Sequence, residues 1–160
     1  MKFILFLCFA GLLVGTLLAK LCKEEIPKGK KYFNIIMRGC LALVGIKIMY
    51  NFKISLTVIL GIIVGYFVSM LDYLVLGAAL VLLLEPVTSG LIFLYGMPYG
   101  SLIKGKAKDK LKVVMINFIL FLLPLLLFIG NVNLRYENEI AAFCAAYLIT
   151  RALKWKLPML

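Results

Sequence analysis

Histidine is absent from this sequence of 160 residues. The absence excludes the Ser-His and Cys-His pairs of nucleophilic catalysis, and it removes the commonest metal ligand of proteins. No C-x-x-C pair occurs either, and three of the four cysteines lie inside apolar segments; the four are Cys8, Cys22, Cys40 and Cys144. We interpret them as small hydrophobic residues. The sequence therefore predicts no metal site and no cofactor, and it identifies no catalytic residue.

Acidic residues are scarce as well. Seven Asp and Glu stand against 18 Lys and Arg, which gives a net charge of +11. In a soluble protein this excess would indicate a nucleic acid as partner, but the chain carries no recognised nucleic-acid-binding motif. The cations instead flank long apolar runs, where lysines meet anionic lipid head groups. We expect membrane lipids with anionic head groups as partners, and no nucleic acid.

Hydrophobic residues make up 64% of the chain, whereas ordinary soluble domains contain about 45–50% apolar residues. A soluble fold of this size leaves too much of its chain at the surface to hide such a composition. Lipid offers no partner to backbone N–H and C=O groups, so each crossing has to be helical. The expected fold is all-α, with residues 1–160 forming a single integral membrane domain.

Six apolar segments are separated by polar stretches, and we expect five or six of them to span the membrane as a polytopic helix bundle. They run Phe3–Ala19, Phe33–Tyr50, Ile54–Leu71, Tyr73–Met97, Val113–Gly130 and Ile140–Leu153. A spanning helix needs about 20 mostly apolar residues. The first, third and fifth segments meet this requirement. The second is weakened by Arg38 and Lys47, and the sixth is short.

The basic stretches 20–31 and 101–112 and the C-terminus are predicted to be cytoplasmic, because loops on that side carry an excess of Lys and Arg. The protein would then be a multi-pass protein of the cell membrane with its N-terminus outside. Alternate lysines of the second stretch are expected to contact lipid head groups; they are Lys104, Lys106, Lys108, Lys110 and Lys112.

The charge pattern conflicts with a simple count of segments. Three segments separate the two basic stretches, but an even number of crossings is needed to put both on one side. Either Phe33–Tyr50 lies in the membrane interface, or Tyr73–Met97 enters and returns as a hairpin. A third arrangement has six plain crossings with both termini inside, and it leaves the first basic stretch outside.

Glu85 is the most informative single residue, because it follows three leucines inside the fourth segment. A carboxylate in hydrocarbon is costly unless it is paired or protonated. Pro86 cannot donate to a helix ladder, so the pair predicts a break between two half-helices. We interpret Glu85, Thr88 and Ser89 as a candidate ligand or ion site. The alternative is a structural kink in which Arg38 or Lys47 is the intramembrane counter-ion of Glu85.

Two G-x-x-x-G patterns predict close helix packing. They are Gly11 to Gly15 and Gly61 to Gly65. Small residues four positions apart let two helix backbones approach each other. Packing within the chain is favoured over dimerisation, although a homo-oligomer or a membrane partner subunit stays open.

Three functions are therefore compared. The favoured one is a small permease or substrate-binding transporter subunit that uses the break at Glu85. The alternative is a non-catalytic assembly or scaffold subunit that packs through its G-x-x-x-G faces. The third is a membrane lipid-modifying enzyme, for which the polar groups are few: Asp72 is most simply an interfacial residue at a segment end.

Overall fold

The computed structural model describes residues 2–22, 24–53, 55–68, 70–83, 85–103, 107–129 and 137–154. Within these ranges the regular structure is entirely helical, as the composition predicts. The helices are α1 (Lys2–Leu21), α2 (Ile26–Asn51), α3 (Thr57–Phe67), α4 (Asp72–Leu83), α5 (Pro86–Leu102), α6 (Ala107–Ile129) and α7 (Glu137–Lys154).

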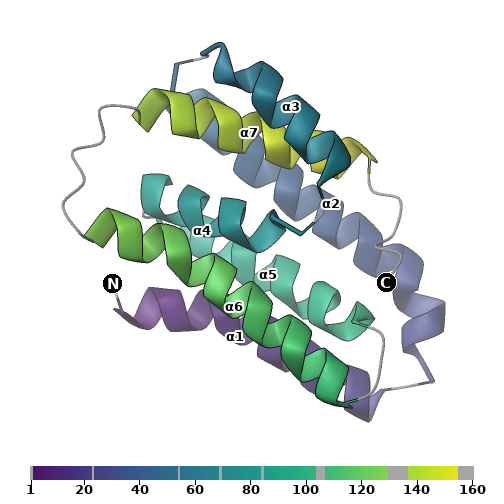
Figure 1. The fold of residues 1–160 in the computed structure, drawn as a ribbon. Helices are drawn as coiled ribbons and strands as arrows, with labels where there is room; N and C mark the ends of the chain where they lie inside the picture. Colours follow the sequence, from purple (N-terminus) through teal and green to yellow (C-terminus); the bar gives the residue numbers. More distant parts are fainter. Residues whose placement is uncertain are drawn as a thin grey trace.

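Consecutive helices alternate in direction, so the chain passes back and forth between two ends of a bundle (Figure 1). The last turns of α1 and α5 and the first turns of α2 and α6 lie together at one end. We call this the basic end, because the described lysines of both basic stretches belong to these turns: Lys20, Lys28, Lys30, Lys31, Lys110 and Lys112. Lys104 and Lys106 lie outside the described residues, as does the side chain of Lys108.

The helices form two groups. In the first group, α7 packs against both α2 and α3. In the second, α1 packs against α5 and α4 packs against α6, with smaller contacts from α4 to α5 and from α1 to α6. The two groups meet where α2 packs on α5, a contact more extensive than those from α4 to α5 and from α1 to α6, and at smaller contacts of α4 with α7 and of α2 with α4. This boundary between the α2–α3–α7 group and the α1–α4–α5–α6 group positions the candidate site.

The fourth apolar segment contains two helices, α4 and α5, with a break at the predicted position. Glu85 is extended, with φ −109° and ψ 146°, and Pro86 begins α5. The two helices fold back on each other as a hairpin, since the rings of Tyr73 at the start of α4 and Tyr99 near the end of α5 are 5.3 Å apart. Of the arrangements compared above, the structure has the hairpin, and the two basic stretches consequently share one end.

Helix lengths differ from two of the expectations. The third segment, expected to span, contains the 11-residue α3, which is about 16 Å long. Its helix ends because Val68 is extended, with φ −109° and ψ 114°. The second segment, expected to be weak, forms the continuous 26-residue α2. By length and composition, α2 is the one helix among the described residues suited to cross a membrane, while 8–21, α3 and α4 are shorter apolar helices.

The G-x-x-x-G faces pack inside the chain, as predicted. A Cβ added to Gly11 or Gly15 would clash with the backbone of Phe93 or Met97 in α5. A Cβ on Gly61 or Gly65 would lie 2.5 Å from the carbonyl oxygen of Phe143 or 2.9 Å from that of Tyr147, both in α7. Glycine is therefore needed for α1 to reach α5 and for α3 to reach α7.

Candidate functional site

A buried ion pair joins the two helix groups. Asp72, the first residue of α4, pairs with Arg151 in the last turn of α7. Arg151 donates from Nε to Oδ1 of Asp72 at 3.0 Å and from Nη2 to Oδ2 at 3.2 Å. The two residues are 3% and 7% exposed. This side-on geometry with two parallel hydrogen bonds is the strongest arrangement that Arg and a carboxylate form.

Two tyrosines complete the shell around the carboxylate. Tyr147 of α7 donates to Oδ1 of Asp72 at 2.7 Å, and Tyr95 of α5 donates to Oδ2 at 3.0 Å. Each carboxylate oxygen thus accepts two hydrogen bonds, which fills its acceptor capacity. A ligand can reach the Asp72 carboxylate only by displacing one of these donors.

Aromatic rings seal this polar group from its surroundings. The Tyr95 ring stacks on Tyr99 at 5.6 Å, and Tyr73 packs against Tyr95 at 5.8 Å. Asn117 of α6 lies 3.5 Å from the hydroxyl of Tyr99. The hydroxyl of Tyr73 is buried without a hydrogen-bond partner among the described residues. A buried ion pair in such dry surroundings depends on every one of its hydrogen bonds.

Asp72, which the sequence presents as an interfacial residue at a segment end, has its side chain buried beneath two tyrosines, and its partner Arg151 is buried as well. One sequence signal was available: Tyr147 and Arg151 are four residues apart, so they share a helix face. Their meeting with Asp72 depends on how α7 lies on α4, which no local pattern encodes.

A second ion pair joins the same two groups. Lys47 of α2 pairs with Glu85 at the turn between α4 and α5. Their side chains are 25% and 45% exposed, so this pair is far less buried than the first. Of the two counter-ions predicted for Glu85, the structure has Lys47. Arg38 is exposed and lies at the middle of α2, nine residues before Lys47.

The structure separates the roles of Thr88 and Ser89, which the sequence placed in one candidate site with Glu85. Both are buried. The Ser89 hydroxyl donates to the carbonyl of Pro86 at 2.6 Å, and the Ser89 carbonyl accepts from the Cys8 thiol at 3.6 Å. Thr88 is 0% exposed, and its hydroxyl has no hydrogen-bond partner among the described residues. Thr88 is thus the member of the pair that can still bind something.

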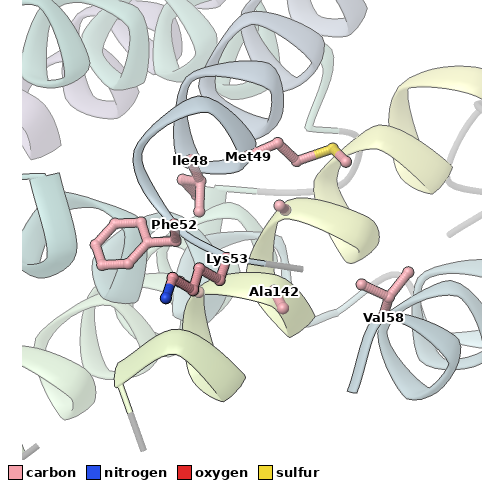
Figure 2. Close-up of a pocket in the computed structure, with 8 residues that line it drawn as sticks. Ile48, Met49, Phe52, Lys53, Val58 and Ala142 are labelled. Carbon is pink, nitrogen blue, oxygen red and sulfur yellow. The ribbon is translucent and has the colours of Figure 1, made fainter. Parts of the chain in front are cut away.

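A small hollow lies away from both ion pairs, at the junction of α2, α3 and α7. Figure 2 shows Ile48, Phe52 and Lys53 beside Val58 and Ala142. Met49, Ala141 and Ala145 complete its lining. Since Lys53 is the single charged side chain of this lining, the hollow offers no matched polar contacts to a solute.

Comparison of the chain with protein-family models, with curated proteins and with solved structures finds no match.

Proposed function

We propose that the chain is a polytopic membrane protein that acts as a small solute permease, with the Asp72–Arg151 pair as its central functional element. The lipid-facing surface supports the membrane part of this proposal. Helix α3 contains no charged residue, and its large apolar side chains are exposed. Ile59, Leu60 and Phe67, for example, are 56%, 57% and 77% exposed. Contiguous apolar surface of this kind is unfavourable in water and is satisfied by lipid.

The distribution of charge supports one orientation. The basic end carries the described parts of both lysine-rich stretches, whereas the described cations near the Glu85 turn are Lys47 and Lys53. Cytoplasmic loops are enriched in Lys and Arg, so the basic end belongs in the cytoplasm. Helix α2 has 26 residues and therefore spans about 39 Å, which is enough to cross the hydrocarbon core of about 30 Å.

The observation that carries the permease proposal is the buried pair between α4 and α7. Charged side chains inside a membrane bundle are rare and mark solute or ion pathways. Here the charges join two groups of helices rather than neighbours within one group. Many transporters work by moving one such group against the other around a polar centre.

The two alternatives have less support. The scaffold hypothesis needs the G-x-x-x-G faces to be available to a partner, but α5 and α7 cover them. The lipid-enzyme hypothesis needs Asp72 to be open to the membrane interface, but four donors already satisfy its carboxylate.

Uptake of radiolabelled solutes by liposomes containing the purified protein tests the proposal. The panel consists of sugars, polyols, amino acids and carboxylates. We expect saturable uptake of at least one class, and loss of that uptake in the Asp72→Asn/Arg151→Gln double variant, which removes both charges together. Uptake equal to that of empty liposomes for every solute, or unchanged uptake in a folded double variant, contradicts the proposal.

A further inference from the structure

Both ion pairs cross the boundary between the two helix groups. Lys47 belongs to the α2–α3–α7 group, and its partner Glu85 lies at the turn of the other group. Arg151 belongs to the first group as well, and its partner Asp72 lies in the second. Each pair therefore holds the two groups together, and each has to break if the groups separate at that point.

The two pairs lie at opposite ends of α4. Asp72 is its first residue, and Glu85 follows shortly after its last residue, Leu83. Thirteen residues separate Asp72 from Glu85, which corresponds to about 20 Å along a helix. Figure 1 shows that the turn from α4 to α5 and the start of α4 face opposite ends of the bundle. The boundary is thus closed at the Glu85 turn and again beside Tyr95, about halfway along α5.

Thr88 lies between the two pairs on the face of α5 that looks onto this boundary. Thr88 and Tyr95 are seven residues apart in α5, about two helical turns, so they share one face. Tyr95 reaches the boundary because it bonds to Asp72. The neighbouring face of α5 instead packs on α1, through the carbonyl of Ser89 and the backbone of Phe93.

The Thr88 hydroxyl is fully buried and has no partner among the described residues. Most buried hydroxyls are hydrogen-bonded, so an orphan of this kind points to a ligand that supplies the missing bond. The charges on either side of Thr88 cancel within each ion pair. The solute that such a site favours is small, carries no net charge and forms hydrogen bonds.

We propose that Thr88 binds a small neutral polar solute in a pathway along this boundary, and that the Lys47–Glu85 and Asp72–Arg151 pairs are the gates that close the pathway on either side of Thr88. This inference rests on the proposed permease function. The Lys47–Glu85 gate opens to the outside and the Asp72–Arg151 gate opens to the cytoplasm. Only one gate is open at a time.

The test uses Thr88→Cys as a reporter. Cys8, Cys40 and Cys144 are replaced by Ala, so that Cys22 is the one native cysteine that stays. The probe is a neutral, sugar-linked methanethiosulfonate that does not cross the bilayer. It is applied to right-side-out and inside-out membrane vesicles. Ser89→Cys is the matched control, because Ser89 is adjacent and buried, and its hydroxyl is bonded to the carbonyl of Pro86 in its own helix.

We expect slow labelling of position 88 with both gates intact. Glu85→Gln should raise labelling from the outside by about two- to fivefold, the range that a partly exposed ion pair allows. Asp72→Asn/Arg151→Gln should raise it at least tenfold from the cytoplasmic side and not from the outside. The exchanged pair Lys47→Glu/Glu85→Lys should return outside labelling to the original rate, which shows that pairing rather than misfolding controls access. Position 89 should stay unreactive throughout.

Three results would overturn the inference. The first is no labelling of position 88 in any variant, and the second is labelling from the same side in both gate variants. The third is an equal rise in the labelling rate at positions 88 and 89, which indicates local unfolding. Solute uptake by liposomes containing the original chain separates these failures from failure of the proposed function, and Cys22 at the basic end reports the orientation. If Cys22 is labelled from the cytoplasmic side, the orientation stands and only the gates are refuted. The rate of each reagent at position 88 is divided by its rate with a free thiol in solution. If a charged methanethiosulfonate then reacts faster than the neutral one, the proposal that the solute is neutral is overturned.

Discussion

Asp72 and Arg151 are 79 positions apart in the sequence, yet the guanidinium meets the carboxylate through two hydrogen bonds of 3.0 and 3.2 Å. The pair fixes the start of α4 to the end of α7 and so joins the two helix groups. Because both residues are buried, each depends on the other for its charge to be tolerated.

The Asp72→Asn variant should be strongly destabilised, because it removes the carboxylate charge that faces the buried Arg151 guanidinium. Breaking one side of a buried pair costs about 3–5 kcal/mol. Thermal unfolding in detergent, followed by circular dichroism, measures the loss. The Asp72→Asn/Arg151→Gln double variant should recover part of it, since no lone charge remains. A double variant less stable than Asp72→Asn would show that the charges are not coupled.

The Glu85→Gln variant should behave differently, because the Lys47–Glu85 pair is partly exposed. Exposed ion pairs contribute about 0–1 kcal/mol. We expect a small change in the unfolding midpoint, and a coupling of this size in a double-mutant cycle with Lys47→Gln. A loss as large as that of Asp72→Asn would contradict the ranking of the two pairs and would place Glu85 in a dry environment.

Tyr147→Phe should destabilise the fold by about 1.5–3 kcal/mol, because the hydroxyl donates to a charged acceptor. The ring and its packing are kept, so the change reports the hydroxyl alone, which lies 2.7 Å from Oδ1 of Asp72 and 3.0 Å from the Val68 carbonyl. Tyr32→Phe is the matched control, since Tyr32 is 68% exposed. If both variants have the same free energy of unfolding as the original chain, Tyr147 does not support the carboxylate.

Gly15→Ala should destabilise the bundle by about 1–3 kcal/mol, because the new methyl group has to push α1 away from α5. Gly39→Ala in α2 is the control, since a Cβ there meets nothing within 4 Å. Alanine favours the helix over glycine, so Gly39→Ala should be neutral or more stable by about 0.5–1 kcal/mol. Chemical unfolding of both variants checks the difference, and a harmless Gly15→Ala would refute the close α1–α5 contact.

Local sequence patterns predicted the all-helical fold, the break at Glu85 and the glycine contacts. Each of these depends on residues close together in the chain: a proline after a carboxylate, or two glycines four positions apart. The charge pattern also required an even number of passes between the basic stretches, and the α4–α5 hairpin supplies it.

The Asp72–Arg151 pair could not be predicted in this way. Asp72 stands at the end of an apolar segment, where interfacial residues are common, and its partner comes from a helix far along the chain. The length of α3 was mispredicted for a related reason. Its apolar run extends beyond Phe67, but the chain turns at Val68, whose carbonyl lies 3.0 Å from the Tyr147 hydroxyl. In both cases a tertiary contact decides the outcome.

The sidedness of the two ends of the bundle tests the account most directly. Cys22 is exposed at the basic end, and Asn138→Cys places a thiol in the first turn of α7 at the opposite end, each as the single cysteine of the chain. An impermeant maleimide should label Asn138→Cys from outside intact cells and Cys22 only in inside-out vesicles. Labelling of both positions from the same side, or release of the protein from membranes by alkaline carbonate, would contradict a bundle that crosses the membrane with its basic end in the cytoplasm.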